Sequence, residues 1–351
     1  MNIKSLLIGS AAALVAVSGA RAADAIVAAE PEPVEYVRVC DAFGTGYFYI
    51  PGTETCLQIS GFVRFRVTAT KGTAGYTQNT RARINFDARS ETEMGMLQGF
   101  IRLQSNSGNT FGTDSAVVTD QAIIRLGGLF MGYTESAFAA LWGGGVGNWG
   151  LIQTDNGGSY SYQQRQQIGY RYDADSFYAA LVLEHDANPS LNWTPDVVGV
   201  LGVTQGWGGA FAHVGYDESA KATGVKAGVE LAIAATGGSL RVGGFYSNKI
   251  ANSYGVTFGA IGEVANWSAG LGYTQDLTET LNATLGYQYF DGFSAAKGGT
   301  LKNGHLIEGA LSWTPVTNFN VRLEGNWGTS RSYAGVKTNT ASGFMWVRRS
   351  F

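Results

Sequence analysis

The chain has 351 residues and a nearly balanced charge, with 24 basic and 27 acidic side chains. This balance excludes the strongly basic proteins that bind nucleic acid or the surface of anionic membranes. Its 50 glycines exclude a mainly helical protein, because each Gly destabilises a helix by about 1 kcal/mol relative to Ala. With 12% aromatic and only 15% charged residues, it also lacks the composition of a disordered chain. A strand-rich chain remains, and a mean hydropathy near zero suits a barrel whose lipid-facing and lumen-facing residues average out.

The N-terminus has the three-part layout of a secretory signal peptide. Lys4 precedes an apolar run over residues 6–17, and Ala20-Arg21-Ala22 forms a small-x-small cleavage site. The run is shorter than the roughly 20 residues that a membrane-spanning helix needs, and no later stretch approaches that length. We therefore predict a leader over residues 1–22, followed by an extended periplasmic arm over residues 23–55 and no transmembrane helix.

Two cysteines, Cys40 and Cys56, lie in the exported part of the chain. In an oxidising compartment a disulfide between them is the expected state, and it would stabilise the fold by roughly 3 kcal/mol on the chain-entropy model. The alternative is a pair of unpaired buried thiols. A structural zinc site is not expected, because the chain has no third cysteine and only three histidines.

Alternation of apolar and polar side chains is the strongest pattern in the chain. It is clearest in residues 318–327, where the two sets are Phe319, Val321, Leu323, Gly325 and Trp327 against Asn320, Arg322, Glu324 and Asn326. It recurs over residues 57–68, with Phe62 as an exception, and over residues 80–90, 225–235 and 281–289. Segments of about 10 residues can cross a bilayer when tilted, several apolar sets end in aromatic residues, and short connections alternate with long ones. A soluble β-sandwich, which also alternates, is the competing interpretation.

The pattern predicts an all-β fold, a transmembrane antiparallel β-barrel of about 16 strands over residues 56–351, an even number as in single-chain bacterial barrels. The predicted strands are residues 56–70, 80–90, 96–106, 117–127, 128–134, 165–174, 176–185, 197–205, 207–216, 224–235, 238–247, 265–275, 280–290, 305–314, 318–328 and 341–351. Residues 197–216 alternate least regularly. Phe351 ends the last strand, where barrel precursors present an aromatic residue to the assembly machinery.

Several motifs resemble those of one bacterial family. They are Val39-Cys40-Asp41, the block from Gly46 through Tyr-Phe-Tyr-Ile-Pro-Gly-Thr-Glu-Thr to Cys56, and Ile59-Ser60-Gly61, together with residues 120–126, residues 131–136 and the terminal Phe351. The chain resembles the alphaproteobacterial porins along its whole exported length. The resemblance implies a homotrimeric outer-membrane protein of a Gram-negative bacterium, a passive channel for small hydrophilic solutes and ions. It implies no cofactor, no metal and no enzymatic activity.

Arginines accumulate on the inward sets of the first four predicted strands: Arg64, Arg66, Arg81, Arg83, Arg89, Arg102 and Arg125. Neighbouring strands lie about 4.8 Å apart, so these cations would form a patch on one wall of a pore. An Arg facing lipid at the bilayer midplane would cost roughly 2–4 kcal/mol, which favours the inward placement. Scattered surface charge on a soluble sheet is the alternative.

Residues 134–164 form the longest stretch without alternation, too long for an ordinary connection, and they follow the fifth predicted strand. Porins of the family that the chain resembles fold a loop inward at this position. The stretch contains Glu135 and Asp155 but no Lys or Arg. An acidic loop facing an arginine wall would set up a transverse field across a constriction. The alternative is an extracellular flap.

Two other motifs are discounted. Residues 145–150 match the dinucleotide fingerprint, but no βαβ unit surrounds them. Glu184-His185-Asp186 could bind a metal or belong to a triad, yet it has no partnering nucleophile, and His185, His213 and His305 lie in separate segments. A barrel hydrolase is therefore disfavoured. A solute-specific channel is the main alternative to general diffusion.

The disulfide is directly testable. Peptide mapping without reductant should recover one linked pair containing Cys40 and Cys56, because an even cysteine count in an exported chain favours pairing. Recovery of both residues as free thiols would contradict this prediction.

Overall fold

The computed structural model describes residues 38–107, 116–186, 193–259 and 262–351. The predicted leader and the first part of the predicted arm, residues 23–37, lie outside these ranges. One short 3₁₀ helix, η1 (Ala295–Lys297), occurs in the described chain, which otherwise consists of strands, turns and loops. In these same ranges no helix is long and apolar enough to span a membrane.

Within the described ranges, 16 long strands form one antiparallel sheet in which each pairs with the next long strand along the chain. They are β2 (Cys56–Thr70), β3 (Thr77–Ser90), β4 (Leu97–Ser107), β5 (Val118–Leu126), β6 (Leu129–Glu135), β7 (Gln164–Asp173), β8 (Phe177–Glu184), β9 (Asp196–Gln205), β10 (Gly208–Asp217), β11 (Ala222–Ile233), β12 (Gly238–Ser247), β14 (Glu263–Asp276), β15 (Leu281–Gly292), β16 (Leu301–Val316), β17 (Phe319–Ser332) and β18 (Lys337–Ser350). Two short strands, β1 (Tyr47–Tyr49) and β13 (Thr257–Phe258), pair with β2 and β14.

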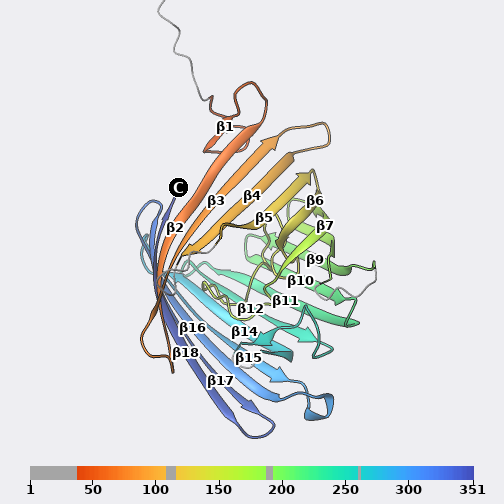
Figure 1. Ribbon diagram of the computed structural model, residues 1–351, viewed down its shortest axis with the longest axis vertical. Helices are drawn as coiled ribbons and strands as arrows, with labels where there is room; N and C mark the ends of the chain where they lie inside the picture. The colour runs from red at the N-terminus through yellow and green to blue at the C-terminus, as the bar shows by residue number, and fades with distance from the viewer. Residues whose placement is uncertain (1–37, 108–115, 187–192, 260–261) are drawn as a thin grey trace, which may run out of the picture. The chain divides into compact units, whose positions relative to one another are not determined.

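The last strand pairs with the first and closes the sheet into a barrel. The β18–β2 register runs from Ser342 opposite Thr70 to Ser350 opposite Phe62. Figure 1 shows β18, in blue, beside β2, in orange. Closure leaves the barrel without a free sheet edge, which confirms the predicted architecture.

Three strands begin three or four residues earlier than their alternation indicated: β3 at Thr77, β16 at Leu301 and β18 at Lys337. The added residues of β3 and β18 are mostly polar on both faces, so they show no apolar and polar alternation. They still pair through the backbone, as Thr68 does with Thr77 and Arg331 does with Lys337. Backbone pairing does not require an apolar face, and the sequence pattern therefore missed these extensions.

The two faces of the barrel wall have opposite character. Val63 and Leu323, from the outward sets of β2 and β17, are 50% and 56% exposed, whereas their inward neighbours Arg64 and Glu324 are buried. This distribution reverses that of a soluble protein and is typical of a barrel surrounded by lipid. The soluble β-sandwich interpretation is wrong, because the strands form one closed sheet instead of two packed ones.

The described part of the arm is fixed to β2. A disulfide joins Cys40 to Cys56 with a Cα–Cα distance of 5.9 Å, as the sequence predicted. β1 adds backbone pairing to β2, and the hydroxyl of Tyr47 donates to Asp87 at 2.9 Å. Cys40, Tyr47 and Cys56 are buried together in a small cluster. The first barrel strand is therefore held by both covalent and noncovalent contacts.

The C-terminal residue takes part in closing the barrel. The N–H of Phe351 donates to the carbonyl of Gly61, and the N–H of Gly61 donates to the carbonyl of Phe351, both at 3.0 Å. A Cβ at Gly61 would lie 2.2 Å from the carbonyl oxygen of Arg83, so only glycine fits there. Phe351 thus extends the β18–β2 seam by one residue pair.

Deleting Phe351 should lower the yield of folded barrel, because two backbone hydrogen bonds at the closing seam and the terminal aromatic ring are lost. The barrels that do form should keep the interior of the native protein. The fraction that migrates faster unheated than boiled in the outer-membrane fraction measures the yield, with Phe351→Tyr as the control that keeps a terminal aromatic. A deletion variant with a normal yield would refute the prediction.

Candidate functional site

The segment between β6 and β7, residues 136–163, folds into the barrel. Leu151 and Ile152 in its middle are each 1% exposed. The hydroxyl of Thr154 and the N–H of Gly158 both donate to the carboxylate of Glu308 at 2.8 Å, and Glu308 belongs to the inward face of β16. The inward loop that we expected is present, and the extracellular flap is ruled out. Its bounds are slightly narrower than predicted, because β6 continues to Glu135.

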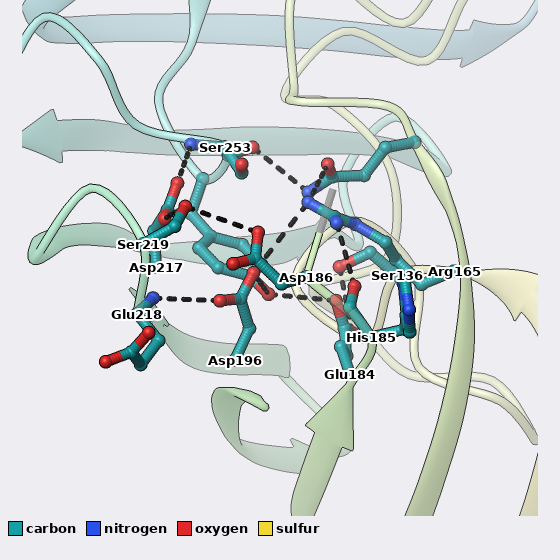
Figure 2. A network of polar contacts seen from close by, with 12 residues as sticks. Ser136, Arg165, Glu184, His185, Asp186, Asp196, Asp217, Glu218, Ser219 and Ser253 are labelled. Carbon is teal, nitrogen blue, oxygen red and sulfur yellow. Dashed lines mark hydrogen bonds and ion pairs between the residues drawn. The ribbon is translucent and has the colours of Figure 1, made fainter. Parts of the chain in front are cut away.

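A buried carboxylate holds the start of this inner loop. The Ser136 hydroxyl and the Ala137 N–H donate to the same oxygen of Glu184 at 2.9 and 2.7 Å. The hydroxyl of Tyr254, from the loop between β12 and β14, donates to the carboxylates of Glu184 and Asp196 at 3.1 Å each. Figure 2 shows Ser136, Glu184 and Asp196 converging in one polar network. Three loops at this end of the barrel are therefore connected.

A buried lysine holds the next part of the loop. Lys226 on β11 is 0% exposed, and its ammonium group donates to the carbonyls of Gly147, Ala139 and Trp149 at 2.7, 3.1 and 3.3 Å. All three of its hydrogens are thus used. Arg241 on β12 donates to the carbonyl of Gly150 at 2.8 Å.

These contacts account for the glycine-rich stretch that matches a dinucleotide fingerprint. Its backbone binds basic side chains of the barrel wall instead of a cofactor. A Cβ at Gly147 would lie 2.5 Å from Nε2 of His213, so glycine permits the close approach of loop and wall. The Gly-rich motif is a packing feature of the inner loop.

Carboxylates on β16 and β17 hold the far end of the loop. The N–H groups of Asp155 and Asn156 donate to Glu324 on β17 at 2.8 and 3.2 Å. This contact places the Asp155 carboxylate 3.5 Å from Arg64 and 3.9 Å from Arg66, both on β2. The acidic loop residue therefore meets the arginine wall directly.

Five of the seven arginines singled out from the sequence lie near one another on β2, β3 and β4. Arg64 and Arg66 contact Asp155, as described above. The remaining three contact polar side chains of adjacent strands, Arg81 with Asn106, Arg83 with Gln104, and Arg102 with Asn85. Arg89 and Arg125 lie away from these five, near the C-terminal ends of β3 and β5. Arg89 donates to the carboxylate of Asp87, and Arg125 donates to the carbonyl of Gly127.

Asp120 on β5 is a site residue that the sequence pattern did not single out. Its carboxylate lies 3.3 Å from Arg83 and 3.8 Å from Arg102. The β4–β5 pairing shifts register between Arg102 and Leu103, so a bulge changes which side chains face inward. Strict alternation cannot assign a residue beside such a bulge.

Arg348 on β18 was missed for a different reason. It follows the buried residues Phe344 and Trp346 on the inward face, while Met345 between them is 45% exposed on the outward face. With two bulky apolar residues on the lumen side, the inward set of this strand does not read as polar in the sequence. A search for arginines two residues after an aromatic residue would have found it.

Glu135 has a different role from Asp155. Its carboxylate accepts the indole N–H of Trp149 at 3.0 Å, so it contacts the loop itself. Burial, followed by the charge of Glu135, raises the pKa of the Tyr160 and Tyr162 hydroxyls on the inner loop. Asp155 is the inner-loop carboxylate that pairs directly with the arginines, at 3.5 Å from Arg64.

Replacing Lys226 with Met should loosen the inner loop without opening the barrel. Three buried carbonyls would lose their donor, at a cost of about 1–3 kcal/mol for each unsatisfied group. Hydrogen exchange should accelerate in residues 136–150 and stay unchanged in the strands. Lys302→Met, at an exposed lysine of β16, is the matched control. Equal loop protection in the two variants would contradict the assigned role.

Sequence comparisons identify relatives. The model of a family described as a porin subfamily matches residues 24–346. Porin Omp2b of Brucella suis biovar 1 and Porin Omp2b of Brucella melitensis biotype 1 are each 44% identical to the chain over 246 residues, which make up 62% of this chain and 66% of theirs. The aligned region is just under two thirds of the length of these relatives.

Solved structures share the fold. The outer membrane channel DcaP of Acinetobacter baumannii matches with a TM-score of 0.69 at 14% identity, over 86% of this chain and 99% of that one. The anion-selective porin from Comamonas acidovorans matches with a TM-score of 0.57 at 13% identity, over 85% and 100% of the two chains. OmpT of Vibrio cholerae in its trimer form has a TM-score of 0.58 at 12% identity, over 85% and 100%. With a family model that matches most of its length and a closed barrel that encloses an inner loop, the chain belongs to the porin family.

Proposed function

We propose that the protein is a passive, water-filled channel through which small hydrophilic solutes and ions diffuse, and that residues 136–163 form its constriction. As a porin with a closed barrel, it lies in the outer membrane of a Gram-negative bacterium. The observation that carries the proposal is the inner-loop residue Asp155, which forms ion pairs with Arg64 and Arg66 on the inward face of β2. This contact brings opposite charges together at the place where the loop narrows the lumen.

The constriction would act on permeating solutes through its field. Arg64, Arg66 and Arg81 lie on the wall, and Asp155 faces them from the loop. Fixed charges of both signs on the lining of a narrow passage orient water and favour solutes that can align their dipoles. Apolar solutes gain nothing from this field, so the passage would select small hydrophilic molecules.

No observation supports the hydrolase alternative. Nδ1 of buried His213 contacts the carbonyl of Phe138 at 2.9 Å, whereas Nδ1 of His305 contacts the hydroxyl of Tyr287 at 2.7 Å. These two rings therefore have structural partners in different parts of the barrel. The relatives are porins, which are channels and not enzymes.

The partners expected of such a channel follow from its surfaces. We propose that lipid covers the outward apolar sets and that the barrel-assembly machinery reads the strand ending in Phe351. We propose a homotrimer as the assembled form, and the trimer form of OmpT, a barrel of the same fold, supports it. The short turns and the arm would then face the periplasm, and the long loops the exterior.

Replacing Arg81 and Arg83 together with Ser should shift ion selectivity toward cations and raise conductance slightly. Same-face residues two apart lie about 7 Å from each other, inside the roughly 8 Å Debye length at physiological salt, so they act on an ion as one patch. The change also frees Asp120 from Arg83. Reversal potentials across planar bilayers under a KCl gradient measure selectivity, and the shift should fade as salt rises.

The control replaces Ala82 and Ile84, on the opposite face of β3, with Ser. This variant should leave the reversal potential unchanged and reduce assembly instead, because its polar groups would face lipid. A reversal potential identical in the wild type and the arginine variant would overturn the constriction as proposed.

A further inference from the structure

Guanidinium groups and aromatic rings alternate along the inward face of β18, β2 and β3. The Arg64 and Arg348 guanidinium carbons lie 6.0 and 4.9 Å from the centre of the Trp346 ring. The guanidinium carbons of Arg348 and Arg83 lie 5.7 and 5.1 Å from the centre of the Phe62 ring. Each ring is therefore flanked by two cations, in the order Arg64, Trp346, Arg348, Phe62 and Arg83. Arginine favours such positions, because its planar group is attracted to aromatic faces.

The strand register concentrates charge in this row. Arg348 on β18 lies directly opposite Arg64 on β2, and Arg64 lies directly opposite Arg81 on β3. Like charges in directly opposed positions of neighbouring strands destabilise a sheet. The arrangement therefore calls for negative charge beside it.

The protein supplies only part of that negative charge. Asp155 is 3.5 Å from Arg64, but within the described residues no carboxylate comes within ion-pair distance of Arg81 or Arg348. Nε of Arg64 and Nε of Arg348 are also buried without a hydrogen-bond partner there. Asp155 is also shared with Arg66, so positive charge on Arg64, Arg81 and Arg348 is left for an anion from the lumen.

We propose that Arg348, Arg64 and Arg81 form a binding step in the pore for small divalent oxyanions, and that Phe62 and Trp346 are positioning residues that hold the guanidinium groups. The inference rests on the proposed channel function and deepens it by naming a class of solute. A divalent oxyanion can accept paired N–H bonds from more than one guanidinium, whereas chloride offers no such geometry. The ligand class therefore follows from the number and shape of the donors.

Phe62 is the residue whose role is least expected from its type. It interrupts the polar inward set of β2, which continues with Arg64 and Arg66, and it lies directly opposite Arg83 of β3. Exposing an apolar ring to the water of the lumen is unfavourable. Here the ring of Phe62 instead lies between the guanidinium groups of Arg348 and Arg83. Its removal should let both side chains leave the row.

The experiment uses the full-length assembled protein in planar bilayers bathed in KCl, with sulfate as the probe. Sulfate should reduce the chloride current saturably, and the half-blocking concentration should rise with KCl, since screening weakens the attraction. Acetate at equal ionic strength is the monovalent control and should give no saturable block. Arg348→Gln should raise the half-blocking sulfate concentration about tenfold, as expected for the loss of a charge-assisted hydrogen bond.

Two matched variants test the placement of the site. Arg349→Gln changes the exposed neighbour on the outward face of β18 and should leave the half-blocking concentration at the wild-type value. Phe62→Leu should raise that concentration severalfold, while Phe65→Leu, on the outward face of the same strand, should not. A purely structural role for Phe62 would lower the heat resistance of the barrel without moving the sulfate block.

The outcomes separate this inference from the proposed function. Channels that conduct KCl but show no saturable sulfate block would overturn the binding step and leave the channel function standing. Equal effects of Arg348→Gln and Arg349→Gln would also overturn it. Folded barrels that conduct no ions at all would overturn the channel function, and the binding step with it.

Discussion

Hydrogen bonding between β18 and β2 closes the sheet, and the remaining architecture depends on this closure. Lipid offers no hydrogen-bond partners, so a sheet edge exposed to it would leave a row of backbone groups unsatisfied. The seam extends to Phe351, whose backbone pairs with Gly61. With no free edge, the outer surface can be apolar throughout, and the polar and charged side chains of the strands are left to face the interior.

The backbone N–H and C=O groups of the inner loop also need hydrogen-bond partners inside the barrel. The loop has no regular secondary structure, so these partners come from the wall. Basic residues, chiefly Lys226 and Arg241, bind its carbonyls, whereas Glu184, Glu308 and Glu324 accept its N–H groups. Buried charges that would be costly alone are thereby hydrogen bonded, and the loop is held at several points. Asp155 reaches the arginines because this framework places it there.

The charge pattern of the lumen follows from strand order and register together. Antiparallel neighbours bring Arg348, Arg64 and Arg81 into one row although they are distant in sequence. The Trp346 ring lies between Arg64 and Arg348, and the Phe62 ring lies between Arg348 and Arg83. Asp155 compensates part of the charge, and the excess is the basis of the proposed binding step for anions.

Local alternation in the sequence was sufficient to predict the barrel, its strand number and most of the arginine patch, because lipid on one side and water on the other impose a period of two. The disulfide followed from the presence of two cysteines in an exported chain. The inward position of the loop came from the resemblance to porins and not from alternation. Alternation alone missed Asp120, because a bulge shifts the β4–β5 register, and Arg348, because aromatic residues precede it on the inward face of β18. The partners of Lys226, Asp155 and Phe62 were decided by the tertiary structure alone, because contacts across a closed barrel join residues that no local periodicity relates.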